Sequence, residues 1–112
     1  MSEVVENVND ENYEDFTQAP AAIVAYGIAN CEPCKAYDPI LADMAKSHTH
    51  VRFGKAQMHV PGKCRGIKKQ HNFETYPTTH FFSNGNLLLT REGQVATEEL
   101  TALIAEHFST MS

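Results

Sequence analysis

Hydrophobic residues along the chain fall into two patterns, short continuous apolar runs and helical spacings. Residues 21–27 (Ala-Ala-Ile-Val-Ala-Tyr-Gly) form an apolar run about one strand long, which predicts a central strand buried on both faces. In residues 32–47 the apolar positions share one helical face, with Pro33 in the first turn and Pro39 as an internal kink. Residues 97–108 have apolar spacing typical of an amphipathic helix.

Weaker patterns predict the remaining elements. The Asn-Gly pair within residues 83–86 is a strong hairpin signal between two β-rich runs. The other predicted elements are a strand at 4–8, a helix at 10–19 capped by Asn9 or Asp10 and stopped by Pro20, a strand at 51–58, a short basic helix at 64–70, and strands at 78–82 and 87–90. Strand–helix alternation followed by a hairpin predicts an α/β fold: one mixed sheet flanked by helices on both faces, in a single domain over residues 1–112.

Charge and composition exclude several classes of function. The formal net charge of -5 argues against non-specific nucleic-acid binding, which needs a basic face. No run approaches the about 20 apolar residues of a membrane span. The acidic start, residues 1–6, lacks the basic and apolar regions of a secretory signal. We therefore expect a cytoplasmic monomer that binds neither nucleic acid nor membrane.

Two of the three cysteines, Cys31 and Cys34, form a C-x-x-C pair where the predicted central strand meets a helix. A helix N-terminus stabilises a thiolate, because its free N–H groups and the helix dipole favour negative charge. Cys31 should therefore be exposed and attack a substrate disulfide, while Cys34, one turn further on, should be buried and resolve the mixed disulfide.

A zinc site and an inert pair of packing cysteines are the alternatives for this pair. Tetrahedral zinc needs four ligands, and Cys64 together with the histidines would have to complete the set. The chain has no second C-x-x-C and no pair of histidines at the usual spacing, so we expect no metal. The histidines are His48, His50, His59, His71, His80 and His107.

The chain resembles the thioredoxin family over roughly residues 8–108. Several motifs recur in the family's order. They are Cys31–Glu32–Pro33–Cys34–Lys35, similar to C-G-P-C-K; Pro39–Ile40–Leu41, similar to a kinked-helix P-x-L; Tyr76–Pro77–Thr78, similar to the cis-proline signature; and residues 81–85 followed by Gly93, similar to the F-x-N-G hairpin and the glycine beyond it.

The resemblance implies a thioredoxin fold and a protein-disulfide reductase. It implies that Pro77 is cis and packs beside Cys31, where its backbone pairs with a substrate chain. It places Lys55 near the buried cysteine, although a solvated lysine on the third strand is the competing interpretation. It also implies no cofactor beyond the Cys31–Cys34 disulfide, protein disulfides as substrates, and electrons from an NADPH-dependent flavoprotein reductase of the thioredoxin-reductase kind.

Four positions depart from the family pattern. Asn30 replaces the usual tryptophan, Ala25 a buried acid, Glu32 a glycine, and Tyr76 the usual Ile or Thr. Without the acid, deprotonation of Cys34 must rely on water or another base, for which Glu32 and His59 are the candidates. The Glu32 carboxylate should also raise the pKa of Cys31 by repelling its thiolate.

Competing functions remain open at this point. An oxidase or isomerase would use the same cysteine pair, a binding adaptor would use only the exposed face, and glutathione chemistry is disfavoured because Tyr76–Pro77–Thr78 is not the expected T-V-P. The third cysteine, Cys64, follows a Pro-Gly turn, so we expect it in or beside a loop rather than in the core. Its neighbours Lys63 and Arg65 should lower its pKa, which makes it either a regulatory thiol or one without a role.

Overall fold

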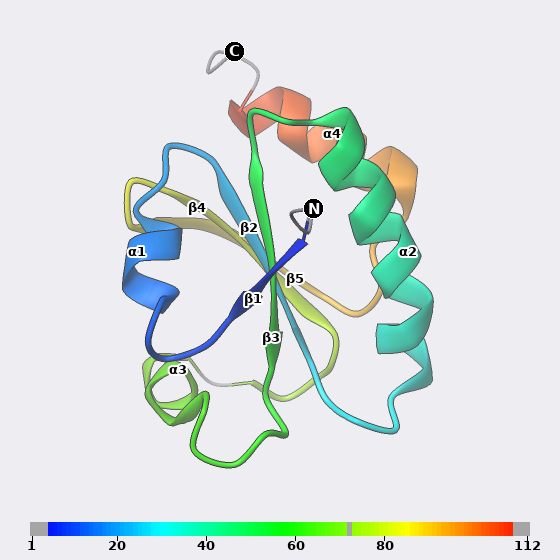
Figure 1. Cartoon of the computed structure of the whole chain (residues 1–112). Helices are drawn as coiled ribbons and strands as arrows, with labels where there is room; N and C mark the ends of the chain where they lie inside the picture. The colour runs from blue at the N-terminus through cyan, green and yellow to red at the C-terminus, as the bar shows by residue number, and fades with distance from the viewer. Residues whose placement is uncertain (1–4, 72, 109–112) are drawn as a thin grey trace.

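A five-stranded sheet forms the centre of the molecule in the computed structural model, which describes residues 5–71 and 73–108 (Figure 1). The strands are β1 (Val5–Val8), β2 (Ala22–Gly27), β3 (Arg52–Gln57), β4 (Thr78–Ser83) and β5 (Asn86–Glu92). The helices are α1 (Tyr13–Thr17), α2 (Glu32–Ser47), α3 (Arg65–Gln70) and α4 (Thr97–Phe108). The predicted α/β fold with one mixed sheet is confirmed.

The sheet has the order β1-β3-β2-β4-β5, so β2 lies at its centre. β3 pairs with β1 and β2 in parallel, whereas β4 pairs with β2 and β5 antiparallel. Every residue of β2 is buried, as the continuous apolar run predicts. A short loop, residues 28–31, connects the carboxyl end of this central strand to α2 and lies at one end of the sheet.

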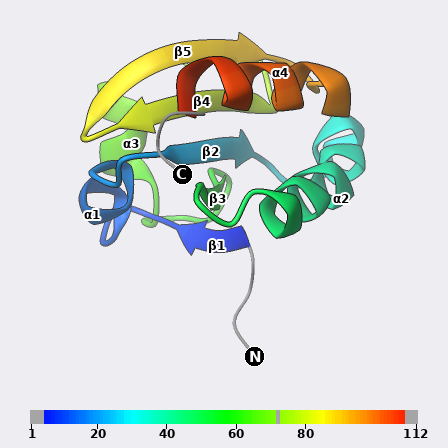
Figure 2. The ribbon, with the colours of Figure 1, turned by 90° about the horizontal axis from the view of Figure 1, so that it is seen from above.

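Helices cover both faces of the sheet, with α2 and α4 on one side and α1 and α3 on the other (Figure 2). Alternate residues of β2 point to opposite faces: Ile23 and Ala25 join the cluster under α2 and α4, while Val24 and Tyr26 join the cluster under α1 and α3. Each cluster packs residues from both of its helices against the sheet, so burial of the two faces holds all four helices.

The hairpin and the long helices lie where the sequence predicts them. Asn84 and Gly85 both have positive φ, 53° and 86°, as a two-residue hairpin turn requires. Val4, at the start of the first predicted strand, lies outside the described residues. None of the helices in the described part of the chain has both the length and the apolar character to cross a membrane.

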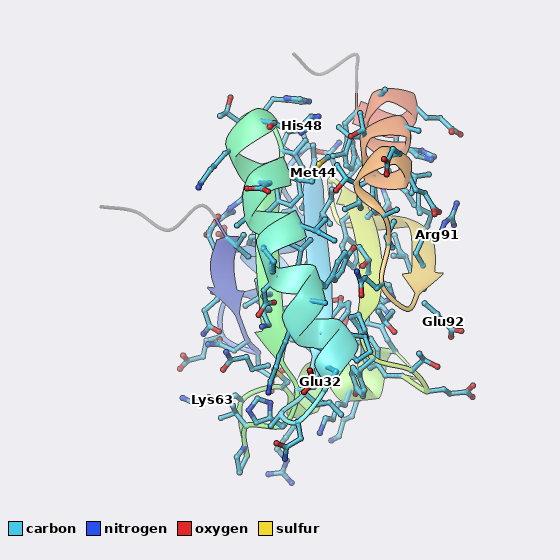
Figure 3. The ribbon with its side chains drawn as sticks, turned by 90° about the vertical axis from the view of Figure 1, so that its right-hand side faces the viewer. Glu32, Met44, His48, Lys63, Arg91 and Glu92 are labelled. Atoms are coloured by element: carbon cyan, nitrogen blue, oxygen red, sulfur yellow. A yellow bond between two sulfur atoms is a disulfide. The ribbon has the colours of Figure 1, made fainter. Side chains whose placement is uncertain are left out.

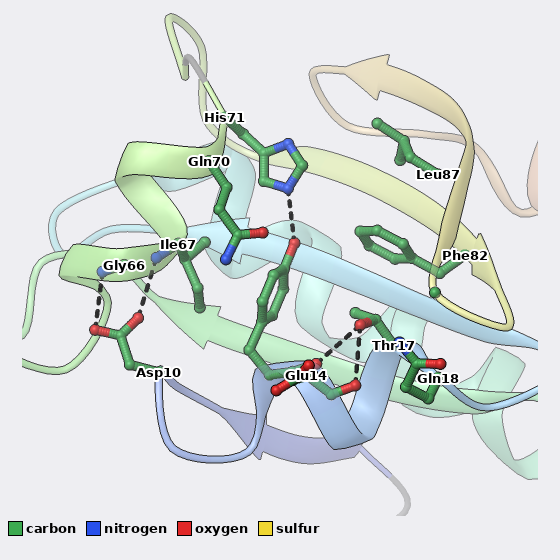
Figure 4. Close-up of a pocket in the computed structure, with 12 residues that line it drawn as sticks. Asp10, Glu14, Thr17, Gln18, Gly66, Ile67, Gln70, His71, Phe82 and Leu87 are labelled. Atoms are coloured by element: carbon green, nitrogen blue, oxygen red, sulfur yellow. Dashed lines mark hydrogen bonds between the residues drawn. The ribbon is translucent and has the colours of Figure 1, made fainter.

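The first helix is shorter than predicted, and neither Asn9 nor Asp10 caps it. α1 begins after Asn12, whose side chain makes no cap hydrogen bond. The carboxylate of Asp10 instead accepts hydrogen bonds from the backbone N–H groups of Gly66 (2.9 Å) and Ile67 (3.0 Å), at the start of α3 (Figure 4). Tertiary packing brings α3 next to the β1–α1 loop, so Asp10 caps a helix far away in sequence.

Candidate active site

Cys31 is the N-cap residue of α2 and is joined to Cys34 by a disulfide bond. The loop from β2 turns sharply before it, with Asn30 at a φ of 58°, and Cys31 itself is extended. The backbone N–H of Cys34 donates to Sγ of Cys31 over 3.2 Å. When the disulfide is reduced, this N–H and the other free N–H groups of the first turn stabilise a thiolate on Cys31.

The expected contrast in exposure between the two sulfurs is small. Cys31 is 9% exposed and Cys34 is 5% exposed, so the prediction of an exposed Cys31 is wrong for this disulfide form. Two groups cover the Cys31 sulfur: the Cys34 sulfur, to which it is bonded, and the carbonyl oxygen of Tyr76, which lies 3.9 Å away.

The Tyr76–Pro77 segment forms the wall beside Cys31. The Tyr76–Pro77 peptide bond is cis, which confirms that prediction. The Tyr76 ring stacks on Phe73 with the ring centroids 6.1 Å apart and an angle of 21° between planes. This stacking holds the segment so that the Tyr76 carbonyl oxygen points toward the cysteine pair.

On the other side of the pair, Cys34 lines a small cavity of about 10 Å³ together with Asp38 and Lys55. Lys55 Nζ lies 2.8 Å from both carboxylate oxygens of Asp38. Lys55 is therefore paired rather than freely solvated. Sequence reasoning missed Asp38, although it follows Cys34 by four residues on a predicted helix, a spacing that places both side chains on one face.

The two bases suggested for Cys34 do not line this cavity. Glu32 lies at the start of α2 with its side chain 89% exposed, 3.8 Å from Lys35 Nζ (Figure 3). His59 is exposed in the loop after β3. Pro33 is exposed in the first turn of α2, as expected. The acidic side chain that the structure brings to Cys34 is thus Asp38.

Comparison with known proteins decides the family. A family model described as thioredoxin matches residues 4–106, a span that includes the cysteine pair and the cis proline. The chain belongs to the thioredoxin family.

Relatives with thioredoxin names are similar over most of this chain. A thioredoxin of Chlamydia pneumoniae is 28% identical and aligns with 93% of this chain and 99% of its own length. The chloroplastic M-type thioredoxin of Spinacia oleracea is 29% identical over 94% of this chain, which spans 58% of that longer protein. Thioredoxin f2 of Chlamydomonas reinhardtii has the same fold, with a TM-score of 0.82 at 21% identity over 93% of this chain and 96% of its own.

These thioredoxin homologues and the bonded Cys31–Cys34 pair support thiol–disulfide oxidoreductase activity, with the chain's own cysteines as the redox centre. Within residues 5–71 and 73–108, no group of three or more His, Cys, Asp or Glu side chains is arranged to hold a metal ion. The redox centre of this thioredoxin-family chain, the Cys31–Cys34 disulfide, lies between the end of β2 and the first turn of α2.

Cys64 lies beside a loop, as the sequence predicts, but it belongs to the core, which the sequence prediction excluded. It immediately precedes α3 but is only 2% exposed, within the cluster under α1 and α3, and its Sγ lies 3.7 Å from the Gln57 carbonyl oxygen. Burial raises the pKa of Cys64, Asp10 raises it further, and Lys68 opposes the shift. The prediction of a lowered pKa is wrong because desolvation of the thiolate outweighs attraction by the neighbouring cations.

Proposed function

We propose that this thioredoxin-family chain reduces protein disulfides, with Cys31 as the attacking thiol and Cys34 as the resolving thiol. The observation that carries the proposal is the place of Cys31 at the N-terminus of α2, where its sulfur accepts the N–H of Cys34 over 3.2 Å. This donor favours the thiolate on Cys31, which is the form that attacks a disulfide.

In this cycle the Cys31 thiolate attacks one sulfur of a substrate disulfide and expels the other as a thiolate. Cys34 then attacks Cys31, which releases the second substrate thiol and forms the Cys31–Cys34 disulfide seen here. Two electrons from an NADPH-dependent flavoprotein reductase restore the dithiol. A cytoplasmic monomer fits this direction, because the cytosol is reducing.

Substrate docking beside Cys31 is part of the same proposal. The Tyr76 carbonyl oxygen, directly before the cis bond to Pro77, lies 3.9 Å from Cys31 Sγ. An extended substrate segment that pairs with this backbone brings its disulfide to the attacking sulfur.

The test is insulin reduction with dithiothreitol, or with NADPH and a thioredoxin reductase. We expect Cys31→Ser to abolish turnover, because the attacking sulfur is gone. Cys34→Ser should instead accumulate mixed disulfides with its substrates on non-reducing gels, since the first step still occurs. Cys64→Ser is the matched control and should retain activity, because Cys64 lies in the opposite cluster.

Three results would contradict the proposal. Mixed disulfides trapped by Cys31→Ser rather than by Cys34→Ser would reverse the assigned roles. A folded wild-type protein with no insulin reduction would favour a binding module, and a midpoint potential well above that of glutathione would favour an oxidase or isomerase.

A further inference from the structure

This inference rests on the roles of Cys31 and Cys34 proposed above. In the resolving step Cys34 must lose its thiol proton. Only the thiolate of Cys34 attacks the mixed disulfide on Cys31. Cys34 is 5% exposed, so its sulfur has little direct contact with bulk water that would take the proton. A nearby base is therefore of direct value for the rate of this step.

The small cavity at Cys34 has four other ionisable side chains in its lining, two tyrosines and the Asp38–Lys55 pair. Burial raises the pKa of Tyr37 to about 12, and its hydroxyl shares a hydrogen bond of 2.8 Å with Thr79. Burial also raises the pKa of Tyr26, whose hydroxyl shares a hydrogen bond with the Tyr13 hydroxyl. Both tyrosines stay protonated, which leaves Asp38 as the base among these groups.

Asp38 has the position and the free lone pairs for this role. It lies one helical turn after Cys34 in α2, so both side chains project from the same face. Lys55 binds both carboxylate oxygens at 2.8 Å and fixes the carboxylate. A carboxylate has about four lone-pair sites, so oxygen lone pairs remain for a proton or for one bridging water.

We infer that Asp38 accepts the thiol proton of Cys34, directly or through one water molecule, during resolution of the mixed disulfide. The Cys34 thiolate then bonds to Cys31 Sγ and breaks the bond between Cys31 and the substrate sulfur. The electron pair of that bond leaves on the substrate sulfur, which takes up a proton. The mixed disulfide and the Cys34 thiol are thus converted into the Cys31–Cys34 disulfide and a substrate thiol. Lys55 is a positioning residue, since it holds the Asp38 carboxylate.

The experiment follows the two steps separately with a small aryl disulfide, dithionitrobenzoate. Attack by Cys31 releases one coloured thiolate, and resolution by Cys34 releases the second. In Asp38→Asn we expect the first release to be unchanged, which also shows that the variant is folded. The second release should slow by at least about 10-fold, because a general base is lost.

The pH profile separates proton transfer from a merely structural effect. In the wild type the second rate should be nearly level through neutral pH, because the carboxylate removes the proton. In Asp38→Asn it should rise about tenfold per pH unit, because only the pre-formed Cys34 thiolate reacts.

Two controls complete the design. Asp43→Asn removes an exposed carboxylate from the same helix and should leave both rates unchanged. The double variant Asp38→Asn with Lys55→Gln removes both charges, so a slow second release there excludes an effect of an unpaired Lys55 ammonium.

An unchanged or faster second release in either Asp38 variant, or a wild-type rate that already rises tenfold per pH unit, would overturn the inference. Absence of any second release in the wild type would instead refute the proposed role of Cys34.

Discussion

At the scale of single residues, Glu32 is the charged side chain directly after Cys31, the thiol proposed to attack the substrate. It is 89% exposed, and Lys35 Nζ lies 3.8 Å from its carboxylate. Two unit charges about 7 Å apart in bulk water interact by only about 0.6 kcal/mol. The structure therefore predicts a weaker effect on Cys31 than a carboxylate in a buried site would have.

Glu32→Gln should lower the pKa of Cys31 and make the midpoint potential less negative, since the thiolate loses a repulsive neighbour. The thiolate fraction of Cys31 below its pKa should rise by about twofold to threefold, and its alkylation rate by less, because nucleophilicity falls with the pKa. The measurements are thiolate absorbance against pH and equilibration with glutathione. Glu98→Gln, an exposed change in α4, is the control. An unchanged alkylation rate, or a fall in it, would show that this charge does not tune Cys31 in the expected sense.

At the scale of elements, α3 depends on a side chain outside it. It has only six residues, one of which is Gly66, and such a short helix is marginal by itself. The Asp10 carboxylate satisfies the N–H groups of Gly66 and Ile67 at its first turn. The cap thereby holds α3 against the sheet and helps to cover Cys64.

Asp10→Ala should lower the free energy of unfolding by about 1 kcal/mol, the usual loss for an N-cap. Urea denaturation measures it, with the neighbouring exposed Glu11→Ala as the control. In the oxidised protein Cys64 is the free thiol, so its alkylation reports opening of α3. We expect faster alkylation in Asp10→Ala, and equal stability of the two variants would show that the cap contributes nothing.

At the scale of the whole molecule, a polar network joins separate elements beneath α1 and α3. The Tyr13 hydroxyl lies 2.8 Å from the Tyr26 hydroxyl and 2.9 Å from His71 Nε2. His80 Nδ1 lies 3.0 Å from the Tyr26 hydroxyl. The network adjoins a groove of about 520 Å³ between α1, α3 and the β4–β5 hairpin (Figure 4). Because His80 is buried in this network, the stability of the fold depends on pH.

Burial, reinforced by nearby His71, lowers the pKa of His80 from its ordinary 6.5 to about 4. Between these values the unfolded chain binds more protons than the folded one, so stability falls as the pH drops from 6.5 to 4. The loss for His80 alone is about 3 kcal/mol.

His80→Leu should flatten this part of the stability profile, measured by urea denaturation at several pH values. His50→Leu, at an exposed position, should not change the profile. An unchanged acid slope in His80→Leu would rule out His80 as its source.

The sequence by itself determined the features that depend on neighbouring residues. The apolar run of β2, the bounds of α2, the Asn84–Gly85 turn and the C-x-x-C pair at a helix start all follow from periodicity and local backbone preference. The cis bond before Pro77 followed from the family resemblance rather than from periodicity. These features fix the fold class and place the cysteine pair.

The tertiary structure alone decided which distant side chains meet. Asp10 caps a helix 56 residues away, and Lys55 pairs with Asp38 across 17 residues of sequence. Cys64 is buried because α3 packs against the sheet, although its sequence neighbours are polar. No local pattern encodes these contacts, because they depend on the order of the strands and on the face that each helix covers. The burial of Cys34 and Cys64, and the Asp38–Lys55 ion pair beside Cys34, could therefore be identified only from the assembled structure.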